Sequence, residues 1–272
     1  MRLKNKSEFL SFTLDLAKKT GDIQLSYFGN ISSIERKSSN IDLLTKADIE
    51  SEKLIISKIK EQYPNHSIIS EETESNLKDS KYTWIIDPLD GTTNFAHNLP
   101  IFAVSIALMK EDKIIMGVVY NPAANKCFYA ELNEGAYLNN RLIQPSSAEK
   151  LSDCLLATGF PYLHDKKYDL SFQIFKDFYD KTRGLRRLGA AALDLCFVAM
   201  GRFDGFYEYN LKTWDICAGA LIASEAGCTV SDWNGKKFPK DGSRILCTNS
   251  KIHDSMMKVL TKPEYKIYFN LS

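Results

Sequence analysis

Two stretches near the N-terminus, residues 7–28 and residues 45–62, carry apolar side chains at helix-like intervals. In chain order these side chains are Leu10, Leu14 and Ala17, followed by Ile49, Ile56 and Ile59. Such spacing places apolar side chains on one face of a helix, where they can pack against a core. We therefore predict two N-terminal helices, the second of which ends before Pro64.

Short segments rich in β-branched and aromatic residues follow these helices. The predicted strands cover residues 67–70, 82–86, 102–109, 113–120 and 126–131. Turn-like residues at 111–112 and 121–122 separate the last three strands, as expected of an antiparallel meander. Pro88 and Gly91 predict that the second of the five strands ends before them.

The second half of the chain alternates strands with helices. The predicted strands cover residues 155–158 and 203–209, and the predicted helices cover residues 169–181, 189–200 and 214–226. Alternation of this kind favours an α/β layer structure. We expect an N-terminal α+β part, residues 1–145, and a C-terminal α/β part, residues 146–272. Because the sequence shows no internal repeat or low-complexity linker, the two parts are expected to pack as one unit.

Composition narrows the class of protein without identifying it. The chain of 272 residues is 44% hydrophobic and 25% charged, which is ordinary for a soluble globular protein. Its formal net charge of +1 does not indicate a general nucleic-acid binder. The charged residues 1–8 do not resemble a secretory signal, and no apolar run is long enough to cross a bilayer. We therefore expect a cytoplasmic protein that does not bind membranes.

The six cysteines are scattered along the chain, with no C-x-x-C pair among them. Most lie in apolar neighbourhoods, such as residues 195–197, where a reduced cysteine packs as a small hydrophobic side chain. We expect free structural thiols rather than disulfides.

The segment with the clearest chemistry is Asp-Pro-Leu-Asp-Gly-Thr-Thr-Asn-Phe at residues 87–95. Its two carboxylates, Asp87 and Asp90, stand three residues apart at a strand end and converge if the backbone turns between them. Carboxylate oxygens suit Mg2+, and successive amide hydrogens from Gly91 to Thr93 would bind an anion. A dication site beside an anion site suits cleavage of a phosphate ester. The alternative is an ordinary turn, in which Asp and Thr occur for local reasons.

Residues 87–95 closely resemble the first signature of the inositol monophosphatase family, and residues 214–220, Trp-Asp-Ile-Cys-Ala-Gly-Ala, resemble the second. The other segments that fit the family are Lys37, residues 42–48, the Glu71-Glu72 pair, residues 189–194 and the segment ending at Glu208. They occur in the family's order and span nearly the whole chain. The resemblance implies an α/β fold, the layered αβαβα sandwich of the inositol monophosphatase and fructose-1,6-bisphosphatase type.

The resemblance also implies a set of metal ligands. By position, the first Mg2+ would be held by Glu71, Asp87 and the backbone carbonyl of Leu89. The second would be held by Asp87, Asp90 and Asp215, and a third, weaker ion is expected near Glu71. Asp215 has an alternative interpretation, because an acidic residue in the first turn of a helix is stabilised by the helix dipole alone.

The catalytic residues implied by the resemblance are Thr92, Asp48 and Glu71. Thr92 would orient the attacking water while Asp48 accepts the hydrogen bond of the Thr92 hydroxyl. Thr45 and Asp48 also have the spacing of a helix capping box, which requires no catalysis.

A further set of residues would bind the substrate. The set that the resemblance implies is Lys37, Asp90, Gly91, Thr92, Gly189, Ala191 and Glu208. A carboxylate such as Glu208 suits vicinal hydroxyls because it accepts a hydrogen bond from each. The alternatives are that Glu208 is an exposed strand-end charge and that Lys37 is a solvated surface charge.

We therefore predict a Mg2+-dependent, lithium-sensitive phosphomonoesterase that hydrolyses inositol monophosphate or a similar polyol or sugar phosphate with a metal-activated water. Fructose-1,6-bisphosphatase and 3',5'-bisphosphate nucleotidase activities are the enzymatic alternatives. A non-enzymatic alternative is binding of RNA or the transcription machinery, which the basic residues Lys181, Arg183, Arg186 and Arg187 would support. Those residues also fit a solvated loop near a dimer contact, since members of the family are commonly homodimers.

Overall fold

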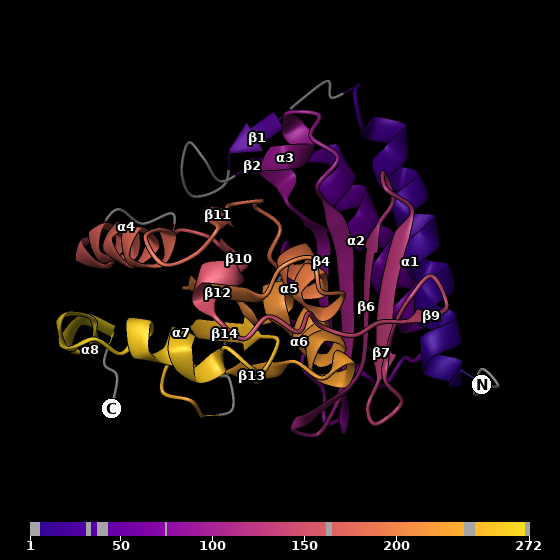
Figure 1. Ribbon diagram of the computed structural model, residues 1–272. Helices are drawn as coiled ribbons and strands as arrows, with labels where there is room; N and C mark the ends of the chain where they lie inside the picture. The colour runs from indigo at the N-terminus through magenta and orange to yellow at the C-terminus, as the bar shows by residue number, and fades with distance from the viewer. Residues whose placement is uncertain are drawn as a thin grey trace.

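The computed structural model describes residues 6–30, 34–36, 43–73, 75–161, 165–236 and 243–269. Its two N-terminal helices, α1 (Glu8–Tyr27) and α2 (Lys46–Gln62), lie side by side on one face of a large sheet (Figure 1). The Ser7 hydroxyl caps α1 by accepting a hydrogen bond from the Leu10 amide at 3.1 Å. The two predicted N-terminal helices are confirmed.

The large sheet has seven strands in the order β3-β4-β5-β6-β7-β8-β9. Their bounds are Ser67–Ser70 (β3), Tyr82–Asp90 (β4), Ala103–Lys110 (β5), Lys113–Asn121 (β6), Lys126–Glu131 (β7), Ala136–Leu138 (β8) and Arg141–Leu142 (β9). Strand β3 pairs with β4 in parallel, and every later neighbour is antiparallel. The predicted meander is therefore confirmed, and two short strands extend it.

A second sheet has five strands in the order β11-β10-β12-β14-β13. Their bounds are Leu155–Thr158 (β10), Gly184–Arg186 (β11), Gly205–Tyr209 (β12), Thr229–Ser231 (β13) and Arg244–Thr248 (β14). Strand β10 is parallel to both of its neighbours, whereas β14 is antiparallel to both of its own. A small separate pair, β1 (Ile34–Arg36) and β2 (Leu43–Thr45), precedes α2.

The remaining helices complete the layers. They are α3 (Thr92–Ala96), α4 (Lys166–Tyr179), α5 (Ala191–Ala199), α6 (Thr213–Ala226), α7 (His253–Leu260) and α8 (Pro263–Phe269), with a 3-10 turn at Leu151–Asp153. Helices α5 and α6 lie between the two sheets, and α4, α7 and α8 lie on the outer face of the smaller sheet (Figure 1). The order helix, sheet, helix, sheet, helix confirms the predicted αβαβα sandwich.

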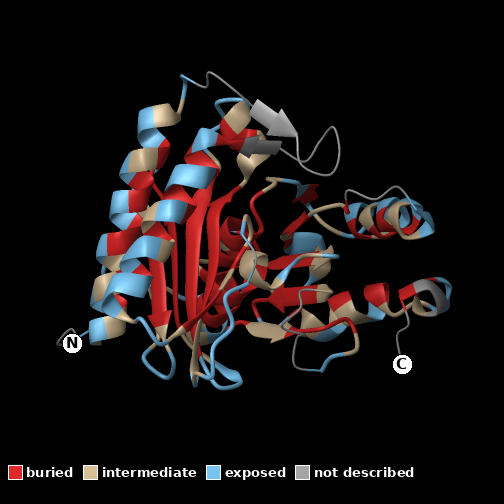
Figure 2. Cartoon of the chain, turned by 180° about the vertical axis from the view of Figure 1, so that it is seen from behind, coloured by how far each residue is buried: buried red, intermediate tan, exposed pale blue. Residues whose placement is uncertain are grey.

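Side-chain alternation along the strands assigns each residue to one of these layers. Trp84 and Ile86 of β4 pack with α1 and α2, whereas Ile85 between them packs with α5 and α6. In the smaller sheet, Phe206 faces α5 and α6 while Tyr207 faces α4 and α7. Because neighbouring residues of a strand point to opposite faces, strands covered on both sides are apolar along most of their length. Figure 2 shows the resulting buried strands between outer helices that are exposed on one side.

Three predicted details are wrong. Strand β4 does not end before Pro88 but continues to Asp90, because its pairing with β5 is irregular between Asp87 and Asp90 and tolerates a proline that cannot donate a hydrogen bond. Ile49 is 47% exposed, and it is Ile55 that shares the buried face of α2 with Ile59. The strand expected at residues 203–209 begins only at Gly205.

Helix α6 approaches the large sheet at a glycine. A side chain at Gly117 of β6 would place its Cβ only 2.8 Å from the backbone oxygen of Ala218 in α6. Since that contact is closer than a carbon atom tolerates, the missing side chain permits the approach. The first turn of α6 carries Asp215, so this contact helps to set where that carboxylate lies.

None of the six cysteines, all of which lie in the described ranges, forms a disulfide, and five of them are buried, as expected of structural thiols. None of the helices in the described ranges combines the length and apolar character needed to cross a membrane. The predicted division of the chain at residue 145 stays a prediction.

Candidate active site

Most of the predicted site residues line one cavity of about 450 Å3, which we call the acidic cavity. The predicted residues on its wall are Glu71, Asp87, Leu89, Asp90, Gly91, Thr92, Gly189, Ala191, Glu208 and Asp215. They come from the chain after β3, the end of β4, the starts of α3, α5 and α6, and the end of β12. Asp48 reaches the cavity through a hydrogen bond to Thr92, and Lys37 lies outside the described residues.

The irregular end of β4 presents the two aspartates of the first signature. The Leu89 amide donates to Asp87 Oδ1 at 3.0 Å, which folds the carboxylate back over the following turn. Gly91 then adopts a left-handed conformation, with φ of 89°, immediately before α3. A Cβ there would lie 2.8 Å from the Ile101 carbonyl oxygen, so glycine is required both for the backbone angle and for the space.

Two of the acids also cap helices of the middle layer. The Ala192 amide at the start of α5 donates to Asp90 Oδ2 at 2.9 Å. The Lys212 amide donates to Asp215 Oδ2 at 2.6 Å in the first turn of α6. Acceptors at helix N-termini satisfy amides that have no partner within the helix, so each carboxylate is held in a defined position. A capping role and a place on the wall of the cavity are therefore compatible for both residues.

Asp48 combines the two roles that the sequence left open. Its Oδ2 accepts a hydrogen bond from the Thr45 amide at 2.8 Å, and its own amide donates to the Thr45 hydroxyl oxygen at 3.4 Å, which together form the capping box of α2. Its Oδ1 lies 3.0 Å from Thr92 Oγ1. The Thr92 hydroxyl also lies 3.0 Å from the Leu89 carbonyl oxygen, so it has two acceptors within reach for its single proton.

Burial of these acids is electrostatically unfavourable without a cation. Desolvation, followed by repulsion from Glu71, raises the pKa of Asp87 well above its ordinary value. Desolvation likewise raises the pKa of Asp215, and it raises the pKa of Asp90 to about 7 although the Ala192 amide opposes the shift. Clustered carboxylates that resist ionisation in a dry site would be stabilised by a bound cation.

The donor set fits a hard divalent cation, because all of its candidate ligands are oxygen atoms. Among the described residues, no group of three or more acidic, histidine or cysteine side chains is arranged to hold a metal ion without further ligands. Mg2+ does not require one, since it usually keeps several waters and takes its remaining ligands from a few carboxylates and a phosphate.

Two residues on the cavity wall, Gly159 and Arg187, were not predicted from the sequence as site residues. Gly159 follows β10, and a Cβ at this position would lie 2.1 Å from Glu208 Oε1, so the Glu208 carboxylate lies directly over it. Arg187, predicted only as part of a basic patch, lines the same cavity and opposes the desolvation that raises the pKa of Glu208 to about 8. The other basic residues of that patch do not line the acidic cavity; Arg183, for example, forms an ion pair with Asp153 at 3.2 Å. A glycine after a buried strand was the available signal for Gly159.

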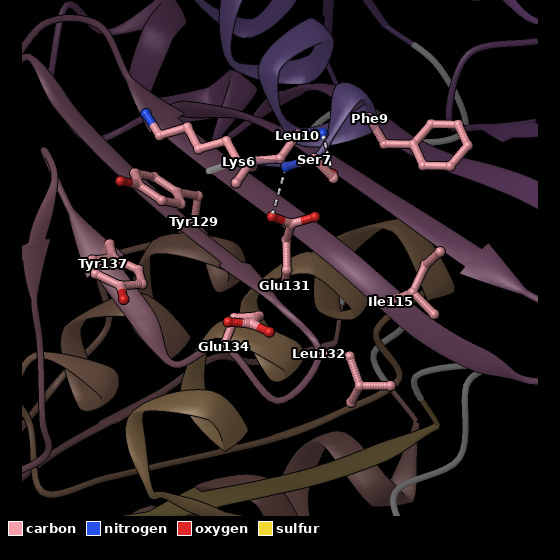
Figure 3. A pocket seen from close by; sticks show the side chains of 10 residues that line it. All are labelled: Lys6, Ser7, Phe9, Leu10, Ile115, Tyr129, Glu131, Leu132, Glu134 and Tyr137. Atoms are coloured by element: carbon pink, nitrogen blue, oxygen red, sulfur yellow. Dashed lines mark hydrogen bonds between the residues drawn. The ribbon is translucent and has the colours of Figure 1, made fainter. Parts of the chain in front are cut away.

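A second cavity of about 510 Å3 lies between the start of α1 and the strands β6, β7 and β8 (Figure 3). The Ser7 amide donates to Glu131 Oε2 at 3.3 Å there, and the rings of Tyr129 and Tyr137 stack with their centroids 5.4 Å apart. None of the predicted site residues lines this cavity, so the acidic cavity is the candidate active site.

The fold and the acidic cavity define a phosphatase of a known family. The chain matches the inositol monophosphatase family over residues 5–263 and belongs to it. Members of this family are metal-dependent phosphatases. The predicted family is therefore confirmed.

Three relatives illustrate the range of proteins that this chain is similar to. It is 42% identical over 255 residues to a protein of Neisseria meningitidis named as a Nus factor, SuhB, covering 93% of this chain and 98% of that protein. It is 42% identical over 236 residues to an inositol-1-monophosphatase of Synechocystis, covering 86% and 82% respectively. The crystal structure of the extragenic suppressor protein suhB from Bartonella henselae superposes with a TM-score of 0.90 at 36% identity, covering 94% of this chain and all 100% of that one.

The raised pKa of Glu208 predicts how stability responds to pH in the metal-free protein. Between the ordinary glutamate pKa, 4.5, and the folded value, about 8, the folded state binds more protons than the unfolded state. The contribution of Glu208 to the free energy of unfolding therefore falls as the pH rises through this range. Glu208→Gln removes the titration, so stability should fall less steeply with pH in this variant than in the wild type.

Urea unfolding at a series of pH values in EDTA measures this difference. The lowered pKa values of His66 and His253 act in the opposite sense near neutral pH, and comparing the two proteins cancels them. The control Glu61→Gln changes an exposed carboxyl whose pKa is already low, and it should keep the wild-type slope. Parallel curves for wild type and Glu208→Gln would contradict the assignment.

Proposed function

We propose that the chain is a Mg2+-dependent phosphomonoesterase that hydrolyses inositol monophosphate or a similar polyol or sugar phosphate. The observation that carries this proposal is the hydrogen bond between Thr92 Oγ1 and Asp48 Oδ1 at 3.0 Å, at the wall of a cavity with four candidate metal-binding acids. An oriented hydroxyl beside a cation site is the arrangement needed to direct a water at a phosphate.

In this proposal the cavity binds two to three Mg2+ ions. The ligands would be the carboxylates of Glu71, Asp87, Asp90 and Asp215 and the backbone carbonyl of Leu89. When bound, the ions would acidify a water and neutralise charge on the phosphate and the leaving oxygen. Burial raises the pKa of Asp87, Asp90 and Asp215, so cation binding and ionisation of these three aspartates should reinforce each other.

Thr92 and Asp48 would orient the nucleophile. If the Thr92 hydroxyl donates its proton to Asp48, its oxygen lone pairs are left to accept a hydrogen from a water. That water then keeps a lone pair directed away from Thr92, toward a phosphate beside Gly91. Asp48 is itself held by the capping box of α2, so the pair is pre-organised rather than assembled on binding. Glu71 would complete the catalytic group through its metal ligation.

The alcohol part of the substrate would contact the other wall of the cavity. Glu208 and Asp90 can accept hydrogen bonds from ring hydroxyls, and the backbone at Gly189 and Ala191 borders the same space. Gly159 fixes the depth of this wall, since the Glu208 carboxylate occupies the space that a side chain would fill. Fructose-1,6-bisphosphate and adenosine 3',5'-bisphosphate remain the alternative substrates, and Lys37 remains a proposed phosphate contact.

The Thr92 hydroxyl should be needed for turnover, whereas a helix cap outside the acidic cavity should be needed only for stability. Thr92→Val keeps the shape and removes the hydroxyl, and we expect kcat to fall by about 10²-fold or more, the usual loss for a positioned proton-transfer group. The matched variant Ser7→Ala removes the side-chain cap of α1 at a residue that does not line the acidic cavity, lowering the free energy of unfolding by about 1 kcal/mol while leaving kcat near the wild-type value. Steady-state kinetics and urea unfolding of both variants measure this separation; a Thr92→Val enzyme with wild-type kcat would refute the role.

Gly159→Ala should impair recognition of the alcohol selectively. The new methyl group would displace the Glu208 carboxylate, so KM for inositol 1-phosphate should rise by about tenfold or more, as expected when a buried hydrogen-bonding group is lost. The matched substrate is p-nitrophenyl phosphate, whose leaving group has no ring hydroxyls, and its kcat/KM should change little. Equal losses of kcat/KM on both substrates would show that Glu208 does not recognise the alcohol part of the substrate.

The same two substrates, together with fructose 1,6-bisphosphate and adenosine 3',5'-bisphosphate, rank the substrate classes for the wild-type enzyme by kcat/KM. The highest value on inositol 1-phosphate is expected. A preference for the nucleotide would replace the proposed substrate class.

A second candidate role is association with RNA or the transcription machinery, which the Nus factor name of one relative favours. Asp87→Asn separates the two roles, because it removes a candidate metal ligand and leaves the basic residues at 181–187 intact. We expect this variant to lose turnover by orders of magnitude and, if the second role exists, to keep wild-type affinity for RNA in a filter-binding assay. A homodimer would fit either role.

A further inference from the structure

Helix α2 carries a second buried acid that the proposed chemistry does not use. Glu52 is only 4% exposed and stands one turn after Asp48. Its Oε1 accepts a short hydrogen bond from the Ser70 hydroxyl and another from the Glu72 amide at 3.1 Å. No lysine, arginine or histidine among the described residues forms an ion pair with it. A buried carboxylate held only by neutral donors is costly, so its position calls for a reason.

The two donors flank one residue of the acidic cavity. Ser70 ends β3, Glu72 lies beyond it, and Glu71 stands between them on a segment that has left the strand. A single oxygen atom of Glu52 therefore holds the residues on both sides of Glu71 by hydrogen bonds. Without an acceptor there, the buried Ser70 hydroxyl and the half-buried Glu72 amide would each lose this partner.

Asp48 and Glu52 are four residues apart, so they project from the same face of α2. Asp48 contacts Thr92, and Glu52 contacts the chain around Glu71. One rigid turn of helix thus connects the residue that would orient the water with a residue that would bind the cation. The position of Thr92 relative to Glu71 is then set by α2 rather than by the irregular segments that carry these two residues.

We propose that Glu52 is a positioning residue that fixes Glu71 for cation binding. This inference rests on the proposed function, in which Glu71 is a metal ligand. Partners behind a metal ligand commonly change metal affinity by about 10- to 100-fold when they are removed.

Mn2+ binding to the metal-stripped protein, followed by electron paramagnetic resonance, tests this role without relying on activity. Glu52→Met keeps the side-chain length and removes the acceptor oxygen, so the Mn2+ dissociation constant should rise by about tenfold or more. Glu52→Gln retains an amide oxygen at the position of Oε1 and should bind Mn2+ within about threefold of wild type, if it is the acceptor rather than the charge that matters. Glu61→Met, at an exposed position of the same helix, is the matched control and should leave Mn2+ binding unchanged.

Glu71→Gln separates failure of this inference from failure of the proposed function. If Glu71→Gln binds Mn2+ as wild type does, the metal assignment itself is wrong. If Glu71→Gln weakens binding and folded Glu52→Met does not, the positioning role of Glu52 is overturned. Should Glu52→Met unfold at the assay temperature, Ser70→Ala decides: removal of one of the two donors should weaken Mn2+ binding severalfold, and unchanged binding would overturn the proposal.

Discussion

Desolvation and mutual repulsion of the carboxylates gathered at one end of the large sheet are the constraint on which the site depends. Asp87 and Asp90 come from the irregular end of β4, Asp215 from the first turn of α6, and Glu71 from the chain after β3. The fold offsets part of this repulsion with backbone amides, which donate to the three aspartates at 2.6 to 3.0 Å. The remainder favours a bound cation, so the elements that position the acids also create the need for a metal.

Regular parts of the fold were predictable because apolar residues recur in the sequence with the period at which a helix or strand buries its side chains. The helical spacing of residues 7–28 and the continuous apolar strands of the large sheet matched the layers, and the capping spacing of Thr45 and Asp48 was correct. Periodicity could not show that β4 runs through Pro88 to Asp90, because a strand irregularity depends on the pairing of its neighbour. Gly159 could not be predicted for a similar reason, because its role depends on Glu208, a residue of a distant strand whose carboxylate lies over it.

The candidate site was predictable to a different extent on its two sides. The metal-binding side is carried by short signatures, and the cavity brings their acids together as the resemblance implied. The alcohol side is built from single residues on separate elements, including Arg187, which the sequence alone placed in a surface patch. Membership of the inositol monophosphatase family agrees with the metal-binding side, and relatives carry both phosphatase and Nus factor names. In the proposed function, substrate identity therefore depends on the wall formed by Glu208, Gly159 and Arg187.

The central claim is that the acidic cavity binds divalent cations. Crystals grown with Mn2+ and measured at its absorption edge would locate bound ions directly by their anomalous scattering. The account predicts strong anomalous peaks within about 2.5 Å of the carboxylate oxygens of Asp87 and Asp90, the range of metal–oxygen ligation. An active enzyme whose peaks lie away from both aspartates, or that shows none, would contradict the account.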